Sequence, residues 1–120
     1  MRYIDGFLLP VPRRKIEAYR RISSKAGKVW REHGALEYRE CAGDDLANTM
    51  GVTFPARVRA KRGETVVFSW IVYKSRAHRD RVNKKVMKDP RLASMMSGDT
   101  PMPFDMKRMA YGGFRVIVDL

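Results

Sequence analysis

The stretch ETVVFSWIVYKSRAHRD, residues 64–80, decides the fold because it joins a clear strand signal to a capped helix. Residues 65–73 are rich in β-branched and aromatic side chains, which favours a strand. The hydroxyl of Ser75 is suited to accept a hydrogen bond from the first turn of a helix over residues 76–89. Pro90 is expected to stop that helix. The stretch therefore predicts a strand followed directly by a helix.

The N-terminal part of the chain predicts the same pair of elements. Residues 2–11 alternate in the manner of a strand, which Pro10 and Pro12 are expected to end. Pro12 can then open a helix, where its missing N–H costs nothing. Over residues 13–33, apolar side chains recur every three or four positions and predict one buried stripe, with basic residues mostly outside it. Gly34 supplies the expected stop.

The middle of the chain adds two predicted strands. Residues 35–42 alternate and are expected to form one of them. Residues 52–74 are expected to form a hairpin, with Arg62 and Gly63 at the turn and Pro55 marking its first arm as an edge strand.

The last third predicts one further strand and completes the topology. Residues 91–96 are long enough for one helical turn, and residues 107–118 resemble a strand. Gly112 and Gly113 interrupt that strand and indicate a bulge or a close backbone approach. The order strand, helix, strand, strand, helix, strand predicts a single α+β domain over residues 1–120. It is a ferredoxin-like βαββαβ subunit whose antiparallel sheet carries two helices on one face.

Neither face of this sheet is polar enough to lie comfortably in water. The strand over residues 65–73 presents Val66, Phe68, Trp70 and Val72 on one side and Val67, Ser69, Ile71 and Tyr73 on the other. A large exposed aromatic face is unusual in a monomer. Burial against a second copy is the simplest remedy, so the sequence predicts a homodimer.

Composition limits the location of the protein and the kinds of metal site to be expected. The longest apolar runs fall short of the ~18 residues that span a bilayer, so we expect a soluble cytoplasmic protein with no membrane partner. The chain has one cysteine, Cys41, which we expect to be buried in a strand. His33 and His78 lack the spacing of a zinc site, and their expected role is capping or hydrogen bonding at helix edges. We therefore expect no metal and no cofactor.

Four segments of the chain carry a resemblance to a known family. The segments YIDGF, ETVVFSWIVYKSRAHRD, KVMKDPR and MPFDMKRMAYGGF resemble those of the YbaA-like family of small bacterial proteins of unknown function. This family is placed in the dimeric α+β barrel superfamily. The resemblance implies a homodimer in which two sheets face each other, with a cavity between sheet and partner. The superfamily includes cofactor-free monooxygenases, small isomerases and heme enzymes, and neither histidine here is placed as a heme ligand.

One hypothesis is that the cavity binds a small molecule, with or without catalysis. Asp5 lies mid-strand, where an unpaired carboxylate would have a raised pKa useful for acid–base work. The alternative is that Asp5 pairs with Lys107 or Arg108 on the last strand. Tyr111 with Arg108 could hold an oxyanion. The candidate catalytic residues are Asp5, Asp105, Arg108 and Tyr111, and the candidate ligand-binding residues are Tyr3, Glu40, Trp70 and Phe104. No spacing is diagnostic of one reaction, so the sequence leaves open whether the protein is an enzyme.

A second hypothesis is weak, non-specific binding of RNA or another polyanion. The net charge is +12, and eleven of these twelve charges lie in residues 1–34 and 65–90, which contain the two long predicted helices. The cations predicted on the outer helix faces are Arg14, Arg21, Lys25, Lys28, Arg81, Lys84, Lys85 and Lys88. Such a surface would attract phosphates without reading sequence, or would simply be a solvated face. A third hypothesis is a non-catalytic interaction protein.

Overall fold

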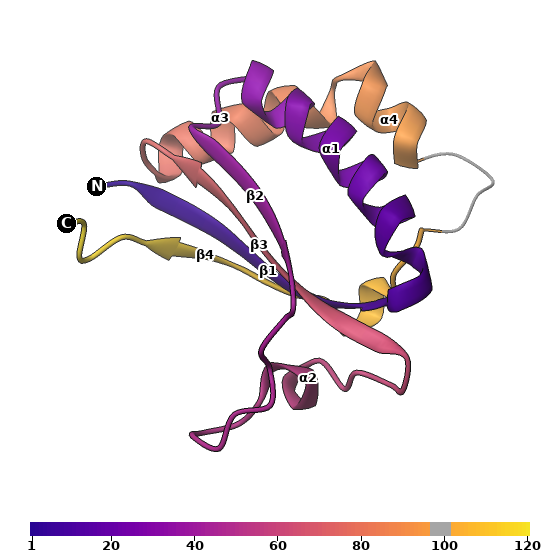
Figure 1. Cartoon of the computed structure of the whole chain (residues 1–120). Coiled ribbons are helices and arrows are strands. Elements are labelled where there is room, and N and C mark those ends of the chain that lie inside the picture. The colour runs from indigo at the N-terminus through magenta and orange to yellow at the C-terminus, as the bar shows by residue number, and fades with distance from the viewer. Residues whose placement is uncertain (97–101) are drawn as a thin grey trace.

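The computed structural model describes residues 1–96 and 102–120. Four strands form one antiparallel sheet in the order β2-β3-β1-β4. The strands are β1 (Tyr3–Pro12), β2 (Glu37–Ala42), β3 (Glu64–Tyr73) and β4 (Ala110–Arg115). The helices are α1 (Ile16–Glu32), α2 (Phe54–Arg57), α3 (Arg76–Met87) and α4 (Pro90–Met96), with 3-10 turns η1 (Arg13–Lys15) and η2 (Met106–Arg108). Figure 1 shows α1, α3 and α4 together over one face of the sheet, and α2 apart from them.

The two central strands, β1 and β3, run antiparallel along their whole length, from Tyr3 opposite Tyr73 to Pro12 opposite Glu64. The face of the sheet under the helices carries two apolar clusters. Ile71, Tyr73, Val29, Val82 and Val86 form one of them, and Leu9, Val11, Val67 and Tyr19 form the other. We call this side of the sheet the helix face and the opposite side the open face.

Both long helices begin and end largely where the sequence predicts. The hydroxyl of Ser75 accepts a hydrogen bond from the backbone N–H of His78 at 3.1 Å and caps α3. Gly34 follows α1 with a φ of 119°, a conformation that glycine adopts without strain. The short helix predicted over residues 91–96 is present as α4.

The predicted first arm of the hairpin is wrong, because residues 54–57 form α2 instead of a strand. The hydroxyl of Thr53 caps this turn by accepting from the N–H of Ala56 at 3.4 Å. Pro55 lies in the first turn of α2, where proline is favoured. The sequence T-F-P-A is therefore a helix start. The proline that we interpreted as the mark of an edge strand is part of that start.

Of the two prolines expected to end β1, Pro12 does so and Pro10 does not. The strand continues to Pro12, and Pro10 lies opposite Val66 of β3. On its other side β1 pairs with β4 only as far as Leu8, opposite Ala110. One edge of β1 is therefore unpaired at Pro10, and a strand tolerates proline at such an edge.

β4 pairs with β1 residue by residue through both glycines, so of the two interpretations of Gly112 and Gly113 the close approach holds and the bulge does not. A Cβ atom on Gly113 would come within 2.8 Å of the Tyr3 ring. The strand is shorter than predicted, and its first predicted residues form η2. Gly113 thus lets the Tyr3 side chain lie flat against β4.

The open face carries exposed aromatic side chains. Phe68 is 46% exposed and Phe114 is 61% exposed. The ring of Phe68 lies 5.6 Å from that of Trp70 and 6.2 Å from that of Phe54. The prediction that Cys41 is buried is wrong, because its side chain is exposed. Tyr38 and Glu40 of the same strand point to the helix face, so strand alternation directs Cys41 to the open face.

Candidate functional site

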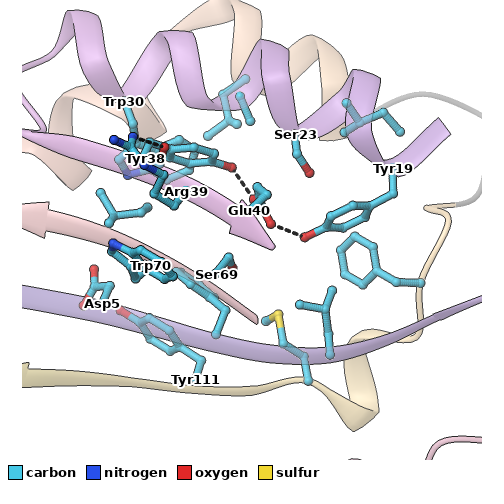
Figure 2. A pocket seen from close by; sticks show the side chains of 18 of the residues that line it. Asp5, Tyr19, Ser23, Trp30, Tyr38, Arg39, Glu40, Ser69, Trp70 and Tyr111 are labelled. Atoms are coloured by element: carbon cyan, nitrogen blue, oxygen red, sulfur yellow. Dashed lines mark hydrogen bonds between the residues drawn. The ribbon is translucent and has the colours of Figure 1, made fainter. Parts of the chain in front are cut away.

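A cavity of about 410 Å³ lies between the helix face of the sheet and the helices α1, α3 and α4. Figure 2 shows it from close by, with α1 above it and the strands below. Its aromatic lining residues are Phe7, Tyr19, Trp30, Tyr38, Trp70, Phe104 and Tyr111. Its methionines are Met87, Met95, Met102 and Met109. The charged residues that line it are Asp5, Glu40 and Arg39, so a mainly apolar space is bordered by two carboxyl groups and one arginine.

Glu40 is held by two tyrosine hydroxyls. Tyr19 of α1 donates to Oε1 at 2.7 Å, and Tyr38 of β2 donates to Oε2 at 2.7 Å (Figure 2). Tyr38 and Glu40 are two residues apart on one strand and therefore share a face. Burial and the negative charge of Glu40 raise the pKa of Tyr19 and of Tyr38 far above its ordinary value. Both hydroxyls therefore keep their protons and act as donors.

Asp5 is the second acid, and it has a cationic partner. The carboxyl group is 1% exposed, and its Oδ1 accepts from Nη1 of Arg79 on α3 at 2.9 Å. The same Nη1 donates to the hydroxyl of Tyr111 at 3.1 Å. Burial raises the pKa of Asp5 above its ordinary value, while the charge of Arg79 opposes the rise. The guanidinium also lies 5.0 Å from the centre of the Tyr3 ring, within the range of a cation–π contact.

Asn83 of α3 lines the cavity and holds two aromatic side chains. Its Oδ1 accepts from Nε1 of Trp30 at 3.1 Å and from the hydroxyl of Tyr73 at 3.3 Å. Among the described residues, every buried side-chain nitrogen and oxygen has a hydrogen-bond partner. The polar groups of this region are thus ordered in advance of any ligand.

The predicted partners of Asp5 are wrong, although the carboxyl group is paired. Arg108 binds Glu64 through two hydrogen bonds of 2.7 Å, and its Nε donates to Asp105 at 3.0 Å. Glu64 lies opposite Pro12, at the other end of β1 from Asp5. This bidentate contact with Arg108 lowers the pKa of Glu64 to about 2.

The predicted oxyanion pair is therefore not assembled. Arg108 is committed to Glu64 and Asp105, whereas the hydroxyl of Tyr111 contacts Arg79. Asp105 caps η2 by accepting from the N–H of Lys107 and does not line the cavity. The geometry gives Asp105 and Arg108 the contacts of a structural cluster beside the turn that precedes β3.

The remaining candidates lie in the cavity wall or beside it. Glu40 and Phe104 line the cavity, with the ring of Phe104 edge-on to that of Tyr19 at 5.7 Å. Tyr111 also lines it and stacks on Phe7 at 4.9 Å. Trp70 borders both this cavity and a second hollow on the open face. Tyr3 is buried under Arg79 outside the cavity lining.

Four residues of this region were not among the candidates predicted from the sequence. They are Tyr38, Arg79, Asn83 and Tyr19, of which Tyr19 was expected only as part of the buried stripe of its helix. Arg79 and Asn83 share a face of α3 with the buried Val82 and Val86, because residues three and four apart on a helix are neighbours. An arginine on the buried stripe of a helix is a signal for a buried acid opposite it.

The histidines occupy helix-edge positions, as predicted. Nε2 of His33 lies 2.8 Å from Asp89, and Nδ1 of His78 accepts from the N–H of Lys74 at 2.9 Å. In residues 1–96 and 102–120, no group of three or more His, Cys, Asp or Glu side chains is placed to hold a metal ion. No helix of the described chain is long and apolar enough to cross a membrane. The eight cations predicted on the outer faces of α1 and α3 are all exposed.

Comparison with known proteins decides the family. A family model described as "Protein of unknown function (DUF1428)" matches residues 2–106. The chain belongs to the DUF1428 family. It is 45% identical over 119 residues to "Uncharacterized protein YbaA" of Escherichia coli (strain K12), and equally to that of Shigella flexneri, in each case over 99% of both chains. The resemblance to the YbaA-like family is confirmed.

Solved structures of low sequence identity share the fold. One is an uncharacterized NIPSNAP domain protein from Burkholderia xenovorans, with a TM-score of 0.54 and 11% identity over 95% of this chain and 93% of that one. Another is Rv0793 from Mycobacterium tuberculosis, with a TM-score of 0.54 and 14% identity over 99% and 98%. At such identities the likeness concerns the α+β architecture alone. The DUF1428 match includes Asp5, Glu40 and Arg79 and ends before Tyr111.

Proposed function

We propose that the protein binds a small, mainly apolar molecule in the cavity between the sheet and the helices. The main support for this proposal is the volume of the cavity, which is about 410 Å³. Ligand sites typically have volumes of about 300–1,000 Å³. Its wall combines aromatic rings with the ordered carboxyl group of Glu40. Apolar walls with a few placed polar groups are the usual composition of such sites.

The methionines of the wall support an adaptable site. Met87, Met95, Met102 and Met109 line the side of the cavity formed by α3, α4 and the segment before β4. Methionine side chains have three rotatable bonds and adjust to the shape of what they contact. The rings of Tyr19 and Tyr38, in contrast, are fixed by their bonds to Glu40. The tyrosines and Glu40 would hold the polar group of the ligand in one position. The methionines would adjust to the shape of its apolar part.

Filling the cavity should weaken binding of a neutral fluorescent probe. Ser23 is buried and lines the cavity, whereas its neighbour Ser24 is exposed on the outside of α1 and does not line it. We expect N-phenyl-1-naphthylamine to bind saturably to the unmodified protein and to Ser24→Leu. The affinity of Ser23→Leu should be lower by at least about tenfold, which corresponds to ~1.4 kcal/mol. Fluorescence titration measures both, and equal affinities would place the probe outside this cavity.

We also propose that the subunit is ferredoxin-like and that two copies pair through their open faces. The strand order β2-β3-β1-β4 with α1 and α3 on one face supports the subunit type. The exposed rings of Phe68 and Phe114 support the pairing, because a monomer rarely leaves such a face in water. Sedimentation should give twice the chain mass and the Phe68→Lys variant should sediment as a monomer, while Ser24→Lys should stay dimeric. A monomeric unmodified protein would refute the pairing.

A more specific version of this proposal is that the cavity catalyses a reaction without a cofactor. Glu40 borders the cavity and could accept a proton from a bound molecule, as general base catalysis requires.

Polyanion binding by the helix faces has weaker support. Acids lie on the same two helices, including Glu17 beside Arg20 on α1 and Asp80 beside Arg79 on α3. The ordered polar groups lie in the cavity and favour a small molecule.

A further inference from the structure

We infer that the ligand of this cavity is an organic amine, whose protonated nitrogen is received by Glu40 between Tyr19 and Tyr38 while its apolar part fills the cavity. This inference rests on the proposed function, because it names the class of molecule bound at the same site.

The hydrogen bonding of Glu40 is incomplete in a specific way. Each carboxylate oxygen accepts one tyrosine hydroxyl, Oε1 from Tyr19 and Oε2 from Tyr38. An ionised carboxylate has about four acceptor positions, so each oxygen can accept one further donor. Glu40 also lines the cavity, where those positions are accessible to a bound molecule. An alkylammonium group carries three N–H donors and no acceptor, which matches this unfilled capacity.

Glu40 has no salt-bridge partner among the described residues, although Arg39 also lines the cavity. The segment 97–101 contains neither Lys nor Arg. Asp5, the other acid of the wall, is paired with Arg79. A buried or half-buried carboxylate is stabilised by an opposite charge, and at Glu40 a cationic ligand can supply it.

Aromatic rings line the cavity into which Glu40 faces. The rings of Trp30 and Tyr38 lie 6.2 Å apart, and the ring of Phe104 contacts that of Tyr19 edge-on. All four rings line the cavity. The faces of aromatic rings attract cations, and tryptophan and tyrosine do so most strongly. A carboxylate among aromatic rings therefore selects a cation over a neutral molecule of the same shape.

The overall charge of +12 repels a protonated amine at long range, whereas Glu40 attracts the amine within the site. A surface groove beside α1 and β2 also includes Tyr38 and Glu40, and it is flanked by Arg20, Lys28 and Arg31. These cations are exposed, and at physiological salt their field is screened over about 8 Å. Glu40 acts on its ligand by direct contact in a less polar space, where charges interact several times more strongly than in water. We expect slow association and a preference that persists in salt.

Three probes of one shape and three charges test the inference. 4-Phenylbutylamine is protonated at neutral pH, 4-phenylbutan-1-ol is neutral, and 4-phenylbutanoate is an anion. Isothermal titration calorimetry at fixed salt should show that the unmodified protein binds the amine at least about tenfold more tightly than the alcohol. The anion should bind most weakly. These three measurements need no variant, so they stand even if a substitution at Glu40 unfolds the chain.

Two charge-matched variants locate the preference. Glu40→Gln should bind the alcohol as the unmodified protein does and lose the preference for the amine. Glu37→Gln removes the same charge from the same strand outside the cavity, and it should keep the preference. Equal binding of amine and alcohol by the unmodified protein, or a preference that survives Glu40→Gln, overturns the amine assignment and leaves the cavity proposal standing. Failure of all three probes and of the neutral fluorescent probe overturns both.

Discussion

Replacing Arg79 with leucine is expected to lower the free energy of unfolding by about 3–5 kcal/mol, the usual cost of leaving a buried charge without its partner. Asp5 is 1% exposed, and its Oδ1 accepts a hydrogen bond from Arg79 at 2.9 Å. Leucine fills part of the space but offers the carboxylate neither a charge nor a donor. Urea unfolding followed by circular dichroism measures the change.

Two further variants separate the ion pair from a general effect of losing a cation on α3. Arg81 is exposed on the same helix, and Arg81→Leu should change the stability by less than about 0.5 kcal/mol. The double variant Asp5→Asn, Arg79→Leu removes both charges and should be more stable than Arg79→Leu alone. If Arg79→Leu costs no more than Arg81→Leu, the ion pair does not hold α3 against the sheet.

Replacing Gly27 with alanine is expected to destabilise the protein by about 1–3 kcal/mol, as overpacking does. In an ordinary helix interior this substitution stabilises by up to ~1 kcal/mol. Here a Cβ atom would lie 2.6 Å from Cδ1 of Tyr38. The ring of Tyr38 cannot move freely, because it packs against Trp30 and its hydroxyl is bound to Glu40. The same urea titration measures the loss.

The control for Gly27→Ala is Ser24→Ala, an exposed position on the same helix where the change should be neutral or slightly stabilising. Displacing Tyr38 should also disturb Glu40, so Gly27→Ala should weaken binding of the fluorescent probe and Ser24→Ala should not. A more stable Gly27→Ala protein would mean that the Tyr38 ring is not fixed against α1.

Most of the fold could be predicted because its elements carry their own local signals. The alternation of residues 65–73, the cap at Ser75 and the stop at Gly34 each act within a few residues. The predictions that were wrong depend on context. Whether Pro55 marks an edge strand or a helix start depends on Thr53 reaching the N–H of Ala56. Whether Pro10 breaks β1 depends on how far β4 extends beside it.

The candidate site was harder to predict because its contacts join distant segments. Strand alternation correctly places Asp5 and Phe7 on one face, but it does not say which face the helices cover. The partner of Asp5 lies 74 residues away on α3, and Glu40 bonds to Tyr19 across 21 residues. Polar residues on buried stripes, such as Arg79 and Asn83, carry the available signal. Sequence patterns favour the apolar members of a stripe and so pass over such residues.

The exposure of Cys41 gives the molecule a built-in labelling position. The chain has a single cysteine, and its side chain is exposed on β2, one residue from Glu40 and directed to the other side of the sheet. A nitroxide attached there would reside outside the cavity and on the face through which we propose that two copies meet. Because Cys41 lies opposite Phe68 of β3, a bulky label there would report the proposed pairing by weakening it, without any engineered thiol. The same label would leave the carboxylate of its neighbour free to be titrated with amine probes.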